Sequence, residues 1–386
     1  MSLLREADTG RNYKLLKYLL SISFIMVVFS TMAQYRFFDH PERMELVRRG
    51  GDFIYNLEED SAGVYIEKVR AELPDHPIVP LMEGLQVLWL HVPVLDSVFE
   101  YFITKMNEAV ELSEQLEGGI NKNDEALFFA LAARGLMAEY YADVGQYMRA
   151  VSEANKAYGL VKRGFEKTDE INEFLFTSGL YNYFRVKYPE INPVYRPFVW
   201  LFKNGDKKLG LEQLDEATRN TIISRIEANI YISYIYLRYE DTPEKAQEYL
   251  SFLIEQYPRN DYLVTKYLES LRADAYFDQV PIDLIERLQH SDRTYMQLAG
   301  FIFKGLYVEK VLNKPNEAVQ YYGRGIDIGK QLPNHGEFYK SLGYLAMGRI
   351  LQDEKPGTAR EYLKKSLEFA ETKDIKKEAR ALLRSE

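Results

Sequence analysis

Three segments in the C-terminal half of the chain align without gaps: PEKAQEYLSFLI (243–254), PNEAVQYYGRGI (315–326) and PGTAREYLKKSL (356–367). Each begins with proline, has alanine three residues later, and has tyrosine three residues after that, followed by Leu or Tyr. Proline suits the first turn of a helix, where its missing N–H needs no partner. Alanine and the following Tyr-Leu or Tyr-Tyr pair fall on one helical face. The pattern therefore predicts three equivalent helices, each with a small residue where another helix packs closely.

A second small residue precedes each of these alanines by thirteen positions, at Ser233, Gly305 and Ala346. This spacing predicts a preceding antiparallel helix that brings its own small residue to the contact. Residues 281–288, PIDLIERL, lie midway between the first two copies and form a degenerate copy with Leu284 in place of alanine. The chain therefore contains a repeated helical hairpin.

The clearest single copy is 131–161, where small and aromatic residues and a turn glycine follow the order of one full repeat. This copy and the C-terminal ones resemble the tetratricopeptide repeat family, whose unit is about 34 residues in two antiparallel helices. The family's early tryptophan is missing here. The resemblance implies an all-α, right-handed solenoid of about seven or eight hairpins. Its packing positions are Ala138, Gly145, Ala150, Ala157, Ser233, Ala246, Tyr249, Pro258, Gly305, Ala318, Tyr321, Ala346, Ala359 and Tyr362.

No linker interrupts the pattern, so we expect one continuous array. We expect divergent hairpins over 34–124, a repeat over 125–168, and a repeat over 169–221 that carries an insertion at 184–205. Further repeats and a capping helix follow over 222–386.

Residues 1–33 have the order of a secretory signal peptide. Arg11, Lys14 and Lys17 precede the apolar stretch LLSISFIMVVF (19–29), and small residues follow it. We expect cleavage between Ala33 and Gln34. The apolar stretch is short for a membrane span, which needs about 20 residues, but an uncleaved anchor helix is the alternative. An exported protein of the periplasm or cell envelope is expected.

The insertion is rich in aromatic residues and prolines. Pro189, Pro193 and Pro197 are expected to break the helix, because proline disfavours helical geometry in the residue before it. The aromatics could seal a neighbouring groove, form a recognition surface, or rest at a membrane interface. The residues concerned are Tyr188, Tyr195, Arg196, Phe198 and Trp200.

Composition and motifs favour no catalytic or nucleic-acid function. The net charge is −9, with no basic stripe to bind phosphates. The chain has no cysteine, and its five histidines show no metal-ligand spacing. No GxSxG, P-loop or GxGxxG motif is present. We therefore expect no enzyme activity, no metal and no cofactor.

The family resemblance implies that the first helices of the repeats line a concave groove. The positions that would face this groove are Glu139, Asp143, Ile230, Tyr234, Leu237, Arg238, Ile302, Leu306 and Glu309. They are largely apolar, so we expect an extended or helical apolar segment of a protein or peptide partner. A membrane-peripheral or envelope-structural component is the second hypothesis, and a catalytic site in the insertion is the third.

Overall fold

The computed structural model describes residues 37–191, 193, 196, 200, 202–273 and 277–384, which form helices and loops without a β-strand. The all-α prediction is confirmed. Within these ranges no helix is both long enough and apolar enough to cross a bilayer. The predicted signal segment, with Ala33 and Gln34, lies outside the described residues, as do Tyr195 and Phe198 of the insertion.

The α-helices are α2 (Pro41–Tyr55), α3 (Glu59–Glu72), α4 (Ile78–His91), α5 (Phe99–Gln115), α6 (Gly119–Lys122), α7 (Asp124–Asp143), α8 (Tyr147–Gly164), α9 (Phe174–Ile191), α10 (Lys207–Asn220), α11 (Arg225–Arg238), α12 (Pro243–Gln256), α13 (Asp261–Ala273), α14 (Ile282–Gln289), α15 (Thr294–Leu306), α16 (Pro315–Gly329), α17 (Glu337–Leu351), α18 (Pro356–Phe369) and α19 (Lys373–Arg384). Short 3₁₀ turns η1 (Phe37–Asp39) and η3 (Phe277–Gln279) and a π-helical turn η4 (Tyr307–Val311) complete the described elements.

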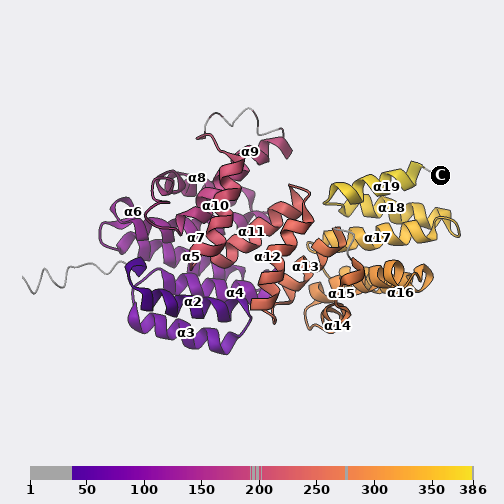
Figure 1. The fold of residues 1–386 in the computed structure, drawn as a ribbon, viewed down its shortest axis with the longest axis horizontal. Coiled ribbons are helices and arrows are strands. Elements are labelled where there is room, and N and C mark those ends of the chain that lie inside the picture. Colours follow the sequence, from indigo (N-terminus) through magenta and orange to yellow (C-terminus); the bar gives the residue numbers. More distant parts are fainter. Residues whose placement is uncertain are drawn as a thin grey trace, which may run out of the picture.

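Neighbouring helices in the sequence pack on each other along the chain (Figure 1). The hairpins are α2–α3, α4–α5, α7–α8, α9–α10, α11–α12, α13–α14, α15–α16 and α17–α18, and α19 packs on α18. First helices of successive C-terminal hairpins also touch, as in α13–α15, α15–α17 and α17–α19. The fold is therefore a consecutive stack of helical hairpins.

The repeated alanines occupy the contacts that the sequence pattern predicts. Ala246, Ala318 and Ala359 are fully buried in α12, α16 and α18, and each of these helices has proline in its first turn. A Cβ added at Gly305 would lie 2.6 Å from the ring of Tyr322, so a larger residue does not fit there.

The other packing positions are also found in or beside the helix contacts. Ala150, Ser233 and Ala346 are buried, while Ala138, Ala157, Tyr249, Tyr321 and Tyr362 are partly buried. Two positions serve turns instead. Gly145 has φ 75° between α7 and α8, a conformation that glycine adopts without strain. The carbonyl of Pro258, after α12, accepts a hydrogen bond of 2.9 Å from Arg287.

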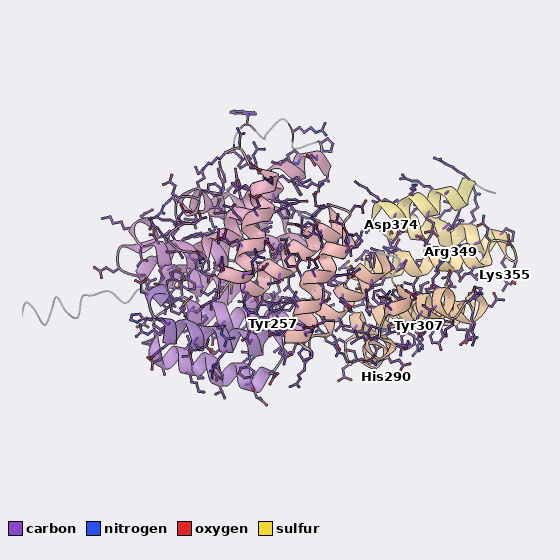
Figure 2. All side chains as sticks on the ribbon, in the orientation of Figure 1. Tyr257, His290, Tyr307, Arg349, Lys355 and Asp374 are labelled. Carbon is purple, nitrogen blue, oxygen red and sulfur yellow. The ribbon has the colours of Figure 1, made fainter. Side chains whose placement is uncertain are left out.

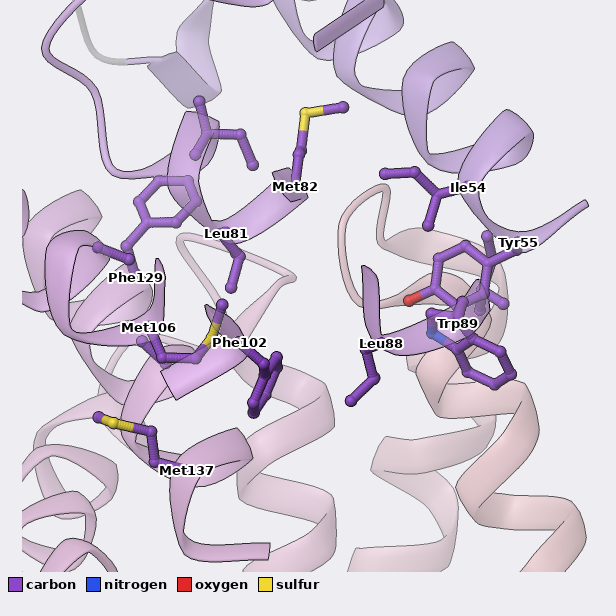
Figure 3. Packing of buried hydrophobic residues seen from close by; sticks show 14 of the residues in the cluster. Ile54, Tyr55, Leu81, Met82, Leu88, Trp89, Phe102, Met106, Phe129 and Met137 are labelled. Carbon is purple, nitrogen blue, oxygen red and sulfur yellow. The ribbon is translucent and has the colours of Figure 1, made fainter. Parts of the chain in front are cut away.

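The hydrophobic core divides into two main parts along the chain. One continuous cluster runs from Phe37 to Leu263, and a second runs from Val264 to Ala379. We call these parts the N-terminal unit (37–263) and the C-terminal unit (264–384). Figure 3 shows the first core close up, where Tyr55 packs against Trp89 with ring centroids 5.0 Å apart.

The N-terminal unit closes on itself, because the end of α2 meets the turn between α12 and α13. Asp52 accepts hydrogen bonds from the Tyr257 hydroxyl at 2.8 Å and from Arg225 at 2.9 Å. The Asn260 amide donates to the carbonyl oxygen of Tyr55 at 2.8 Å. Figure 2 shows Tyr257 where the first helices of the chain meet the middle ones. The end of α2 is therefore joined directly to the α12–α13 turn, about 200 residues away in the sequence.

One expectation about the insertion is wrong: α9 does not end before Pro189 but continues to Ile191. Proline inside a helix removes the hydrogen bond to the carbonyl four residues earlier. Here Pro189 lies in the last turn, so few helical residues follow it and the disruption is small. The carbonyl of Pro189 is bound by Arg196, whose Nε donates to it at 3.0 Å.

Candidate binding cavity

The N-terminal unit contains an apolar cavity of about 630 Å³. Helices α4, α7, α8, α9 and α11 provide most of its lining, to which Tyr55 of α2 and Phe202 also contribute. Representative lining residues are Leu85, Leu136, Ala157, Leu180 and Tyr231. Small-molecule and side-chain binding pockets in proteins occupy about 300–1,000 Å³, so this volume is that of a ligand site.

Local sequence explains why the cavity is apolar and empty of side chains. Phe176, Leu180 and Phe184 of α9 are four residues apart, so they share one helical face. Helix α7 lines the same cavity with small residues, which are Ala132, Gly135 and Ala138. A Cβ added at Gly135 would meet no atom within 4 Å. Small residues on α7 therefore leave the space that large residues on α9 enclose.

The chain after the insertion packs along one side of the cavity. Tyr158 stacks on Tyr181 at 5.8 Å and meets Phe202 edge-on at 4.9 Å. The backbone of Lys203 donates to the Tyr158 hydroxyl at 2.8 Å and accepts from the Tyr181 hydroxyl at 2.6 Å. This aromatic cluster agrees with the hypothesis that the insertion seals a groove.

The described insertion residues do not all take part in that seal. Tyr188 is 43% exposed and lines the cavity. Arg196 binds the Pro189 carbonyl, as described above. Trp200 is 78% exposed and is not among the cavity-lining residues. The recognition and membrane hypotheses therefore concern Trp200 in particular.

Two carboxyl groups line this largely apolar cavity, Glu139 of α7 and Glu227 of α11. Glu139 accepts a hydrogen bond from the Tyr231 hydroxyl, and Glu227 accepts one from Tyr55 at 2.8 Å. Burial raises the pKa of Glu139 to about 8, and the nearby carboxyls of Asp143 and Glu227 add to this effect. Burial also raises the pKa of Glu227.

Glu139 is a predicted groove residue that the structure places in the cavity, whereas Glu227 was not predicted. A signal for Glu227 exists in the sequence. It is the single acidic residue in RIEANIYISYIYLR, the α11 segment, which is otherwise mostly apolar. An acid in such a helix needs either a partner or a special environment.

The remaining groove positions of α7 and α11 have different surroundings. Asp143 is exposed at the end of α7, and Ile230 and Leu237 are half-buried. Tyr234 is 43% exposed, with its ring edge-on to Tyr239 at 5.5 Å. None of these four lines the cavity. Ile230, Tyr234 and Leu237 belong to α11, outside the cavity lining.

Arg238 belongs to a buried ion cluster rather than to an open groove. Glu269 of α13 accepts hydrogen bonds from Arg238, from Lys266 at 2.8 Å and from the Tyr339 hydroxyl at 2.6 Å. Burial alone would raise the pKa of Glu269, but Arg238 and Lys266 hold it below its usual value. This cluster joins the two units, and within it the carboxylate of Glu269 is paired with the cations of Arg238 and Lys266.

The expectation that Ile302, Leu306 and Glu309 face a groove is wrong. Ile302 and Leu306 are core residues of the C-terminal unit. Glu309 is buried and binds Arg349 at 2.7 Å and the Tyr322 hydroxyl at 2.7 Å. The physical reason is the presence of glycines on the neighbouring helices. A Cβ at Gly343 would lie 2.6 Å from the side chain of Ile302. Because glycine has no side chain, Ile302 can pack against α17 in the core.

A second, polar cavity of about 760 Å³ lies near η1. Its buried pair is His76 and Glu125, with Nε2 and Oε1 2.6 Å apart. Ile78 N–H donates to His76 Nδ1 at 3.1 Å, and Phe37 N–H donates to Glu125 at 2.6 Å. Each of these groups has a structural partner, so the pair anchors η1 and the start of α4 to α7. Within the described ranges, no group of three or more His, Asp or Glu residues could hold a metal ion.

Comparisons with known proteins do not add to this picture. No protein-family model matches the chain, and no curated protein matches it. The geometry and chemistry of the apolar cavity therefore carry the functional proposal.

Proposed function

We propose that this chain is an exported, non-enzymatic scaffold of the tetratricopeptide repeat type, a right-handed solenoid that binds a segment of a partner protein. The role that fits an exported scaffold is assembly or maintenance of the cell envelope. The observation that carries the proposal is the 630 Å³ apolar cavity, which is lined mainly by helices of successive hairpins.

The cavity's shape and chemistry favour binding over catalysis. Binding hot spots are formed by aromatic and aliphatic groups that fill desolvated pockets. The cavity supplies such a pocket, and the half-exposed Tyr188 on its margin gives access from solvent. A partner segment that places apolar side chains in the cavity would bury both surfaces, a favourable change of about 25 cal/mol per Å².

The proposal can be tested by photo-cross-linking in the producing cells. A benzoylphenylalanine residue in place of Leu180, in the cavity lining, is expected to cross-link one partner, and mass spectrometry would then locate the bound segment. The same residue in place of Tyr147, which is 68% exposed and outside the lining, is the control. Equal products from both positions, or none from Leu180, would contradict the proposal.

A matched pair of glycine substitutions separates binding from folding. Gly135→Leu places a side chain into the cavity, while Gly159→Leu places one outside it, and neither new Cβ meets an atom within 4 Å. Both glycines lie inside helices, so both changes should stabilise the fold by about 0.5–1 kcal/mol. Only Gly135→Leu is expected to abolish the Leu180 cross-link. Loss of the cross-link with Gly159→Leu would show that the cavity is not the site.

A second candidate, attachment to a membrane surface, is favoured by one observation. Trp200 is 78% exposed, and the nearby Arg196 is also exposed. Tryptophan and arginine are suited to the headgroup region of a bilayer. Flotation of the chain with vesicles containing anionic lipid, compared with that of Trp200→Ala, tests this. Flotation that depends on Trp200 would support the membrane role, and equal distribution of the two proteins would exclude this residue as the anchor.

A further inference from the structure

The two carboxyls of the apolar cavity have hydroxyl partners, and no Lys or Arg among the described residues pairs with them. Glu139 is bound by Tyr231, and Glu227 by Tyr55. Burial raises the pKa of both carboxyls, and hydroxyl groups and other acids also affect these pKa values. No Lys or Arg contributes to either shift. A buried carboxylate is normally paired with a positive charge or loses its own charge by protonation. Both groups satisfy this rule by holding a proton more tightly than usual, since burial raises the pKa of each.

Arginines on two of the helices that line the cavity, α9 and α11, have other partners. Arg225 binds Asp52, and Arg238 binds Glu269. Arg185 of α9 lines the cavity, but its guanidinium donates to the Phe202 carbonyl at 3.4 Å. Arg185 is nine residues after Phe176, whose ring meets that of Tyr231 at 5.5 Å. Nine helical residues span about 13 Å, so Arg185 belongs to the far end of the cavity.

The charged and titratable groups around Glu139 come from four helices. Most of them are carboxyls, which favour an added positive charge when ionised, or neutral phenols, whose oxygens can accept hydrogen bonds from a cation. They are Asp143 and Tyr140 of α7, Glu227 and Tyr231 of α11, Tyr55 of α2 and, at the far end, Arg185 of α9.

Aromatic rings would add to the attraction for a cation. Tyr231, Phe176 and Phe184 line the same cavity. The face of an aromatic ring attracts a cation within about 6 Å, and the attraction is stronger where water is excluded. The cavity thus combines an apolar wall, aromatic rings and two carboxyls that a cation would ionise.

From this arrangement we propose that the segment bound in the cavity carries a Lys or Arg side chain flanked by apolar residues, and that its cation pairs with Glu139 and Glu227. The inference rests on the proposed function and names the chemistry of the partner segment. On binding, the cation displaces a proton from the cavity carboxyls to solvent, because an opposite charge nearby favours the ionised form.

The charge selection can be measured with three probes that share one alkyl chain: octylammonium, 1-octanol and octanoate. Isothermal titration calorimetry at pH 8 is expected to show octylammonium binding about tenfold or more tighter than 1-octanol, the factor for a charge pair worth about 1.4 kcal/mol. Octanoate is expected to bind most weakly. Equal or tighter binding of 1-octanol would overturn the charge selection while leaving the apolar site in place.

Two further readouts separate recognition from a structural effect. The double variant Glu139→Gln, Glu227→Gln keeps the shape of both side chains and is expected to bind octylammonium and 1-octanol alike. In the wild-type protein, octylammonium affinity should rise about tenfold per pH unit from pH 6 towards about 8, since Glu139 ionises over that range. An alkylammonium group stays charged there, like Lys. A flat pH profile would contradict the role of these carboxyls even if the double variant failed to fold.

A further binding experiment with peptides tests whether the cation belongs to a Lys side chain of a partner protein or to a small amine. Two pools of acetylated, amidated hexapeptides have Leu, Ile or Phe at all positions but one, where they carry either Lys or the neutral Nε-acetyl-lysine. The Lys pool is expected to displace octylammonium, and the acetyl-lysine pool to do so at least tenfold more weakly. Failure of the Lys pool where octylammonium binds would assign the cavity to a small amine instead of a partner chain. No binding by any probe or pool would contradict the proposed function as well.

Discussion

Replacing Asp52 by alanine should open the contact that closes the N-terminal unit. Asp52 accepts hydrogen bonds from Tyr257 and Arg225 and also pairs with Arg48 at 2.6 Å. Both are hydrogen bonds to a charged group, which contribute about 1.5–3 kcal/mol each when fully buried. The partly exposed pair with Arg48 adds at most about 1 kcal/mol. Because Asp52 retains some solvent contact, we expect a total loss of about 2–4 kcal/mol.

Urea unfolding and hydrogen exchange would measure this effect. In an open stack each hairpin depends only on its neighbours, so damage at one end stays local. In the closed unit, Asp52→Ala should speed exchange in α2–α3 and in α12–α13 together. Glu111→Ala, which changes an exposed carboxylate of α5, is the control and should alter stability by less than about 0.5 kcal/mol. A loss below that value for Asp52→Ala, or faster exchange in α2 alone, would refute the reasoning.

Three other changes test separate parts of the structure. Gly210→Ala should destabilise the protein by about 1–3 kcal/mol in urea unfolding, because its Cβ would lie 2.5 Å from the backbone nitrogen of Tyr183; Gly357→Ala, whose Cβ meets nothing within 4 Å, should not. Glu139→Gln should stabilise the protein more at pH 8 than at pH 5, by about 2–4 kcal/mol, since wild-type stability falls as pH rises from the unfolded pKa of 4.5 to the folded value of about 8; equal effects at both pH values would contradict the raised pKa. Tyr234→Ala should weaken partner cross-linking with little change in thermal stability, because the ring is 43% exposed; unchanged cross-linking would remove α11's outer surface from the binding site.

Local sequence was sufficient to predict the helical hairpins and their close contacts. Proline at the first turn and alanine three residues later are short-range signals, and Ala246, Ala318 and Ala359 are indeed fully buried. The turn at Gly145 followed from the same spacing, since its φ of 75° is one that glycine tolerates. These features depend on residues within one repeat, so one repeat is enough to recognise them.

Contacts between distant repeats could not be predicted in this way. The bond from Tyr257 to Asp52 spans 205 residues, and no periodic pattern specifies which repeats meet. The same limit explains why the prediction that Ile302, Leu306 and Glu309 face a groove is wrong. Whether Ile302 faces solvent or core depends on Gly343 of another hairpin, and the family position alone does not record that neighbour. Glu227 lines the cavity because α2, α7 and α11 meet there, and the sequence of α11 alone does not specify that meeting.

The closure of the N-terminal unit can be tested directly by pulsed electron–electron double resonance, which measures the distance between two spin labels. The chain has no cysteine, so spin labels can be placed uniquely at Glu58→Cys and Arg259→Cys. The side chains of these residues approach to 4.0 Å across the contact between α3 and the α12–α13 turn. A closed unit predicts a single narrow population at the shortest separations that the method resolves. A broad distribution at long separations would show an open stack, and the closure of the N-terminal unit would then be contradicted.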